Sequence, residues 1–182
     1  QAYRPLIGRY AAEHGRFGDG FSFERMSWIK PNFLWMMYRS GWGTKEGQEV
    51  VLAIRMRRTG FDEILRQAVP SSWSPRLHAT AREWQKAVED SDVRLQWDPD
   101  HGPSGAPLSR RAVQLGLRRA TLARFASEAI LAIDDITELV IAERKHATRP
   151  YTSLQTPAER VFLPDDARAA ANARLDSWGQ AS

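Results

Sequence analysis

The stretch FSFERMSWIKPNFLWMMYRSGWGTK, residues 21–45, says more about the fold than any other part of the chain. Within it, apolar and aromatic side chains occupy nearly every side of a helix drawn from Lys30 to Arg39. Pro31 stands where a first helical turn accepts proline, and Gly41 stands where a helix can end. A helix that is apolar all round is typical of a buried position. The stretch therefore predicts a helix enclosed by the rest of the domain.

Short strand patterns and helix signals alternate on either side of this stretch. Apolar runs predict strands at 49–56, 93–97, 112–117 and 129–133, and the end of a strand at 1–3. Helices are predicted from a Thr59–Asp62 capping pair, from Ser74–Pro75, and over 9–14, 119–126 and 137–146. This order favours an α+β fold with a single mixed, mainly antiparallel sheet covered by helices.

The length of 182 residues suits one domain with an appended tail. We expect a single domain over residues 1–149, lacking an N-terminal strand, because the chain opens at what reads as the end of one. The pattern weakens after Pro150, so residues 150–182 are expected to be a peripheral tail, with a helix from Pro164 to about Trp178.

The composition excludes several classes of protein. There is no cysteine, and none of the four histidines lies three or four residues from another, so no metal site is expected. No apolar run approaches the roughly 18–20 residues that cross a bilayer, and no signal-peptide pattern opens the chain. A cytoplasmic protein without membrane partners is expected. The common nucleotide-binding and hydrolase motifs are also missing, and the sequence leaves the oligomeric state open.

Positive charge and aromatic rings concentrate in the first third of the chain. Residues 1–60 hold ten Lys and Arg against five Asp and Glu, a net charge of +5, compared with +4 for the whole chain. Ten of the eighteen aromatic residues precede position 43. Cations bind phosphate and rings stack on bases, so a nucleotide or nucleic-acid partner is indicated. Solvated arginines around a core helix would produce the same composition.

Three clusters carry the candidate site residues. Arg25, Ser27, Lys30 and Asn32 form a polar cluster just before the predicted buried helix, where free N–H groups favour an anion; the alternative is a solvated turn. Tyr3 and Arg4, at the end of the first strand, are suited to stack on and clamp a nucleotide, unless the chain end is disordered.

The third cluster lies on two later strands. Gln96, Trp97 and Asp98 end one strand, and Asp98 is a candidate general base or binding carboxylate, or simply a turn residue. Gln114 interrupts an apolar strand. A buried amide needs partners, which either the core or a ligand must supply.

Four segments carry a resemblance to a known family: QAYRP at 1–5, residues 21–45, VRLQWDPD at 93–100 and AVQLGL at 112–117. Together they resemble a bacterial and fungal family catalogued as domain of unknown function 4291, over roughly residues 1–147. The run from Trp28 to Trp42 is the most specific part of that likeness.

A more distant likeness is to the ADP-ribosyltransferase-like fold, in which three strand-borne positions hold NAD and the last is often Glu. The resemblance implies that Tyr3 or Arg4, Ser27 and Gln114 occupy these positions, with NAD as cofactor. Gln in place of Glu departs from the pattern, because an amide lacks the charge that stabilises an oxocarbenium-like centre.

These observations lead to two hypotheses. The first is a nucleotide- or NAD-using transferase, in which Arg25 and Lys30 bind phosphates, Tyr3 and Trp28 stack, and Gln114 orients the ribose or acceptor. The second is a nucleic-acid-binding module without catalysis. A third, weaker reading takes Trp28, Trp35 and Trp42 as a partner-binding face.

Overall fold

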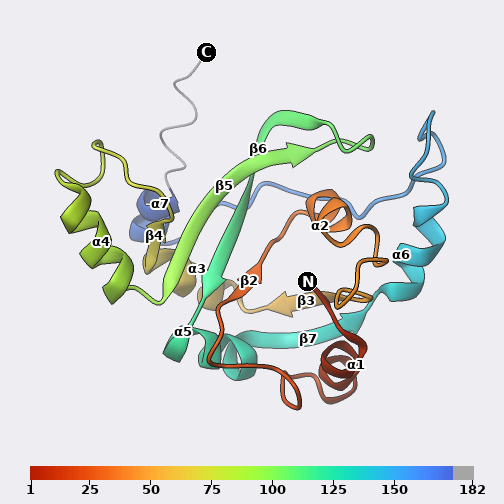
Figure 1. Cartoon of the computed structure of the whole chain (residues 1–182), viewed down its shortest axis with the longest axis horizontal. Coiled ribbons are helices and arrows are strands. Elements are labelled where there is room, and N and C mark those ends of the chain that lie inside the picture. The colour runs from red at the N-terminus through yellow and green to blue at the C-terminus, as the bar shows by residue number, and fades with distance from the viewer. Residues whose placement is uncertain (174–182) are drawn as a thin grey trace.

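The computed structural model describes residues 1–173 and has an α+β architecture (Figure 1). The strands are β1 (Ala2–Tyr3), β2 (Ser27–Ile29), β3 (Val50–Met56), β4 (Ala68–Pro70), β5 (Val93–His101), β6 (Pro107–Leu117) and β7 (Ile130–Asp135). The helices are α1 (Pro5–His14), α2 (Phe33–Ser40), α3 (Arg58–Arg66), α4 (Ala81–Asp90), α5 (Arg119–Arg124), the π-helical turn η1 (Phe125–Ala129), α6 (Thr137–Arg144) and α7 (Ala167–Ala173).

The strands form two sheets, so the single sheet expected from the sequence is wrong. One sheet has the order β1-β3-β7 and is antiparallel throughout. The other has the order β2-β6-β5-β4, in which only the β4–β5 pair is parallel. Strand patterns show which residues are extended but not which strands pair, because pairing depends on contacts between distant segments.

The β5–β6 hairpin is the longest feature of the second sheet and places the candidate site. Its register runs from Val93 opposite Leu117 to Pro99 opposite Arg111, with an irregularity before His101. Successive side chains of a strand point to opposite faces. One face of this hairpin carries apolar residues that are almost completely buried: Val93, Leu95, Leu115 and Leu117.

The main core lies between that apolar face and the first sheet. Leu52 and Ile133 contribute from the three-stranded sheet, and α1, α3 and the α5–η1 segment close the sides. Helix α1 approaches β3 closely, because a Cβ atom at Gly8 would lie 2.5 Å from Val50 Cγ1. The two sheets are therefore layers of one packed core rather than separate units.

Helix α2 and the opposite face of β3 form a second, smaller cluster. Met37, Trp42, Val51 and Val140 are its buried members. The helix begins at Phe33, after Asn32 in an extended conformation, and ends at Gly41, whose φ of 59° is left-handed as its position in the sequence predicts. Most other side chains of α2 are half-buried, so the helix is enclosed less completely than its composition suggests.

The segment after α6 returns along the molecule to α7 and reaches the main core (Figure 1). Ala169 and Ala173 of α7 are buried there, and Trp97 Nε1 donates a hydrogen bond to the carbonyl of Ala173 at 3.2 Å. The domain boundary expected at residue 149 stays a prediction. Residues 174–178 of the helix predicted from the sequence lie outside the described residues.

No helix in the described part of the chain is long and apolar enough to cross a membrane.

Candidate functional site

The polar face of the β5–β6 hairpin brings four of the sequence-predicted residues together. Gln96 and Gln114 are direct partners across the hairpin, and Asp98 follows Gln96 on the same face. Strand β2 pairs with β6 at Ile29 and Leu115, so Lys30 comes next to Gln114 at the end of β2. These residues lie on the side of the sheet opposite to the main core.

Asp98 is the hub of this group. Its Oδ2 atom accepts hydrogen bonds from Lys30 Nζ and from Gln114 Nε2, both at 2.8 Å. Its Oδ1 atom accepts a hydrogen bond from Gln96 Nε2 at 3.0 Å. The Asp98 side chain keeps 19% of its surface exposed, whereas the Lys30 side chain keeps 2%. We refer to Lys30, Gln96, Asp98 and Gln114 as the Asp98 cluster; Gln96, Asp98 and Gln114 are half-buried in it.

Lys30 lies in a buried environment that disfavours its protonated, charged form. Burial lowers the pKa of Lys30 to about 8, and the hydrogen bond to Asp98 acts in the opposite direction. The ring of Trp35 lies beside the ammonium group, with 2.7 Å between Nζ and the ring centroid. The amine can thus exchange its proton near physiological pH, a property that catalytic lysines often have.

A second buried carboxylate stands beside the first. Asp100 has an exposed side-chain fraction of 2%, and its Oδ2 accepts hydrogen bonds from Arg110 Nε at 2.9 Å and Nη2 at 2.6 Å. Asn32 Nδ2 donates to the same oxygen at 3.2 Å. Lys30 thus balances Asp98 and Arg110 balances Asp100, so neither acid is left as an unpaired buried charge.

Trp28 is the aromatic residue on this face. It lies opposite Gly116 in the β2–β6 register, and a Cβ atom at Gly116 would lie 3.0 Å from its ring. The Trp28 side chain is 41% exposed. A flat ring supported by a glycine and open to solvent offers a surface on which a base can stack.

The remaining predicted residues lie elsewhere. Tyr3 and Ser27 face the core side, where their hydroxyl oxygens are 3.2 Å apart, and burial raises the pKa of Tyr3. Trp97 packs against the main core. Arg4 and Arg25 are exposed, and neither side chain forms a hydrogen bond or ion pair with the described residues. Ser27 and Gln114 therefore point to opposite faces of the same sheet.

Sequence reasoning missed Trp35, Asp100 and Arg110. Asp98 and Asp100 are two residues apart, a spacing that puts both on one face if the strand continues through Pro99. The strand predicted from the sequence ended at residue 97 instead, before the breakers Pro99, Gly102 and Pro103. Strand β5 in fact continues to His101, so that signal was present in the sequence but was outweighed.

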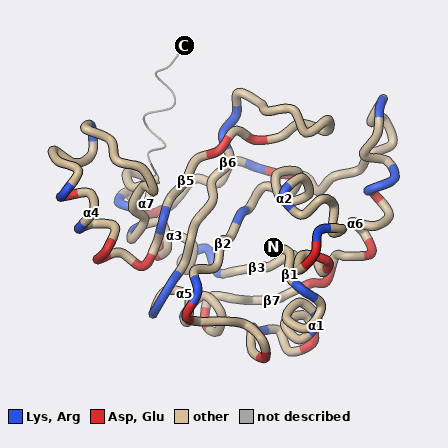
Figure 2. The backbone as a smooth tube through the Cα atoms, viewed as in Figure 1, with Lys and Arg blue, Asp and Glu red and all other residues tan. Residues whose placement is uncertain are grey.

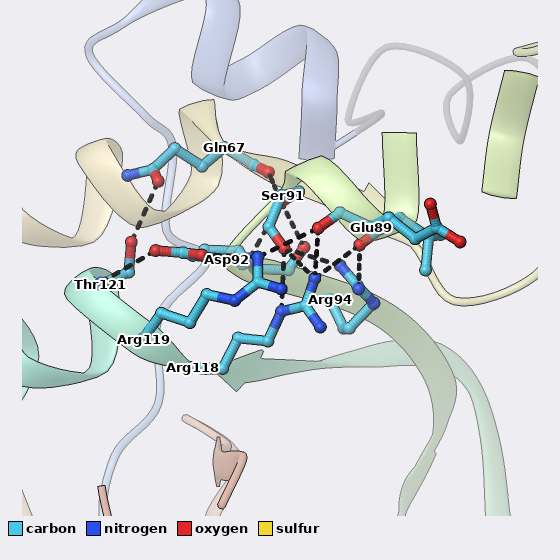
Figure 3. A network of polar contacts seen from close by, with 10 residues as sticks. Gln67, Glu89, Ser91, Asp92, Arg94, Arg118, Arg119 and Thr121 are labelled. Atoms are coloured by element: carbon cyan, nitrogen blue, oxygen red, sulfur yellow. Dashed lines mark hydrogen bonds and ion pairs between the residues drawn. The ribbon is translucent and has the colours of Figure 1, made fainter. Parts of the chain in front are cut away.

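A second polar network, shown in Figure 3, lies at the end of α4. Arg118 Nη2 donates to the carbonyls of Val88, Glu89 and Ser91 at 2.8 to 2.9 Å, and Arg94 and Arg119 donate to carbonyls of the same turn. Cations at a helix C-terminus satisfy its free carbonyls. This arginine cluster thus fastens α4 to the hairpin.

A cavity of about 590 Å³ lies near that network, between β4, the end of α4 and α7. A smaller cavity of about 320 Å³ lies beside Asp100 and is bounded by the start of α2, His101, Arg110 and residues 156–159. We place the candidate site at the Asp98 cluster, because a partly exposed carboxylate and the lysine with a lowered pKa meet there. No group of three or more metal-ligating side chains occurs within residues 1–173.

The fold and this site define an α+β domain with a charged, hydrogen-bonded centre on the outer face of its four-stranded sheet. Comparison with protein families places the chain: it matches the family described as Domain of unknown function (DUF4291) over residues 1–162, and it belongs to that family. The match extends past the 1–147 expected from the sequence. No curated protein and no solved structure gave a match.

Proposed function

We propose that the protein is a nucleotide- or NAD-using transferase whose centre is the Asp98 cluster. The observation that carries this proposal is a partly exposed carboxylate that accepts hydrogen bonds from Lys30, Gln96 and Gln114. Oriented carboxylates beside a proton-exchanging amine are typical of catalytic centres rather than of solvated turns. Trp28 supplies an exposed ring on the same face for a base.

The arrangement changes the version of the ADP-ribosyltransferase-like hypothesis that the sequence suggested. In that hypothesis Gln114 stands at the strand position where the fold often has a glutamate, and a neutral amide cannot supply the negative charge of that glutamate. In the structure its amide donates to Asp98 on the neighbouring strand. We propose that Asp98 supplies the negative charge that would stabilise an oxocarbenium-like centre at the ribose, and that Gln114 and Gln96 orient it. Tyr3 and Ser27 have no part in this version, because they face the core.

The first test is ligand binding followed by thermal unfolding, with NAD, ADP-ribose, and nucleoside mono-, di- and triphosphates. Specific binding raises the melting temperature, by the equivalent of about 2.7 kcal/mol at a hundredfold excess of ligand over Kd. We expect NAD or ADP-ribose to raise the melting temperature of the wild type. The Asp98→Asn variant should bind the same ligand at least about tenfold more weakly, since the charged hydrogen-bonding group is lost.

The matched control is Asp134→Asn, which neutralises an exposed aspartate paired only with the exposed Arg55. This variant should bind as the wild type does. Equal ligand affinities of the Asp98→Asn and wild-type proteins would show that the Asp98 cluster is not part of the binding site.

A nucleic-acid-binding module is the second candidate, and the exposed Arg4 and Arg25 without ion pairs favour it. Figure 2 shows, however, that basic residues are spread over most elements with acidic residues among them. This candidate predicts binding to short single-stranded RNA or DNA that weakens steeply as salt rises, and a reduced salt slope in the Arg4→Gln/Arg25→Gln variant. Absence of binding at low salt would exclude it.

A further inference from the structure

Three arginines, Arg94, Arg118 and Arg119, meet at the end of α4 (Figure 3). The carbonyl of Ser91 accepts hydrogen bonds from Arg94 Nη1 and from Arg118 Nε, both at 3.1 Å. Arg119 Nη1 donates to the carbonyl of Glu89 at 3.1 Å. Carbonyl groups are neutral, so these bonds hold the three guanidinium groups together without cancelling their charge.

The positive charge of this arginine cluster is only partly balanced. Among the described residues, Asp92 is the acid that contacts it, with 3.7 Å between Asp92 Oδ1 and Arg119 Nη1. Burial lowers the pKa of Arg94, and the neighbouring charges of Arg118 and Arg119 lower it further. Three cations therefore face one carboxylate, and a further anion would relieve their mutual repulsion.

Two of the arginines keep donors that a ligand can use. A guanidinium group carries more N–H donors than the contacts of either side chain occupy. Arg118 Nη1 and the Nε and Nη2 atoms of Arg119 form no hydrogen bond with the described residues. The Arg119 side chain is 58% exposed, so its donors are open to a molecule in solution.

The arginine cluster lies on the same face of the sheet as the Asp98 cluster. Along β6, Gln114, Gly116 and Arg118 follow one another at two-residue spacing, and the backbone is still extended at Arg118. Residues at this spacing share a face, and each step covers about 7 Å of strand. Trp28 lies opposite Gly116, between the two clusters. Its exposed ring is thus one step from Arg118 and one step from Gln114.

The proposed site has no other group on this face that is available for a phosphate. Lys30 Nζ donates to Asp98, and its side chain is 2% exposed, so it is not open to a second anion. The base and the phosphates of a nucleotide are separated by a distance similar to one step of the strand. A nucleotide whose base lies on Trp28 can therefore place its phosphates at the arginine cluster.

From this arrangement we propose that Arg94, Arg118 and Arg119 bind the phosphates of a nucleoside diphosphate whose base stacks on Trp28. Arg118 and Arg119 donate to the phosphate oxygens, and Arg94 adds its charge from a buried position. Forked guanidinium donors match the geometry of phosphate oxygens. The inference rests on the proposed function in its choice of nucleotide, whereas the anion site itself requires only the arginines.

The test compares Arg119→Gln with the wild type in calorimetric titrations against ADP, adenosine and inorganic pyrophosphate. Arg119→Gln should weaken the binding of ADP and of pyrophosphate about tenfold, the loss expected when one charge-assisted hydrogen bond is removed. Its affinity for adenosine should be unchanged, because adenosine carries no phosphate. A general loss of structure would instead weaken the binding of all three ligands.

Arg124→Gln is the matched control, because it removes the same charge from an exposed position at the other end of α5. This variant should bind the three ligands as the wild type does. Trp28→Ala is the complementary variant. It should weaken the binding of ADP and adenosine about tenfold, as expected for one stacked base, and leave pyrophosphate binding unchanged.

Equal ADP affinities of the Arg119→Gln and wild-type proteins would overturn the phosphate site, while the proposed function would still stand if Asp98→Asn weakens the binding of NAD. If the wild type binds no nucleotide, the proposed function fails, and the pyrophosphate titrations alone decide. Pyrophosphate binding that Arg119→Gln weakens supports the phosphate site. Equal affinities, or no binding of pyrophosphate to the wild type, overturn it.

Discussion

Single residues in this protein show how burial and partners change chemical character. Lys30 follows an edge strand and would be a solvated cation by position alone. The fold buries its side chain against Trp35, and this burial lowers the pKa of Lys30 to about 8, although Asp98 at 2.8 Å acts to raise it. Gln114, an oddity in an apolar strand, has its amide satisfied by the same carboxylate. The two residues are explained by one shared partner.

The pKa of Lys30 predicts a pH dependence of stability. The folded protein releases this proton near pH 8, and the unfolded chain near pH 10.5. Between these values the unfolded state binds more protons, so the contribution of Lys30 to the free energy of unfolding rises with pH. Urea unfolding across this window should show a steeper rise in the wild type than in Lys30→Gln. Parallel pH profiles would mean that Lys30 titrates normally.

At the scale of elements, the capping patterns in the sequence predicted that helices α3 and α4 exist but not the residues at which they begin. The sequence offered Thr59 with Asp62 and Ser74 with Pro75 as caps, and neither caps a helix. Helix α3 begins at Arg58 without a side-chain cap, and the capping box of α4 is formed by Thr80 and Glu83. Both helices exist near the expected places. Their boundaries follow from where the chain leaves the sheet, which spacing alone does not reveal.

This difference predicts unequal effects on stability for two similar substitutions. Thr80→Ala removes a cap whose oxygen accepts the Glu83 N–H at 3.1 Å, so it should lower the free energy of unfolding by about 1 kcal/mol. Thr59→Ala, at an exposed position inside α3, should have an effect near zero or slightly stabilising, because alanine is the better helix former. Chemical denaturation of both variants measures the contrast. Equal losses would mean that Thr59 also caps its helix.

At the scale of the whole molecule, the two sheets and the returning C-terminal segment form one core. The segment expected to be a peripheral tail brings Ala169 and Ala173 into contact with the main core, and it carries Asp165 and Asp166 to Arg58 and Arg66 of α3. Residues 151–163 contain no helix or strand, which accounts for the weak periodicity after Pro150.

Packing of α7 predicts a position-dependent cost. Ala169 is fully buried, so Ala169→Leu should lower the free energy of unfolding by about 1–3 kcal/mol through overpacking. Ala171→Leu, on the exposed side of the same helix, should change it by no more than about 0.5 kcal/mol. Thermal unfolding compares the two. If both substitutions are neutral, α7 does not contribute to the cooperative core and residues 150–182 are a tail after all.

The sequence by itself determined the class of fold, most of the strands and helices, and the end of α2 at Gly41, and it named Lys30, Gln96, Asp98 and Gln114 as separate candidates. Periodicity, glycine and the chemistry of side chains are local properties, and a strand pattern already states which residues share a face. The tertiary structure decided the number of sheets, the separation of Tyr3 and Ser27 from Gln114, and the contacts of Trp35, Asp100 and Arg110. These features depend on which distant segments pair and pack. A lowered pKa or a buried ion pair arises only where separate parts of the chain together exclude water.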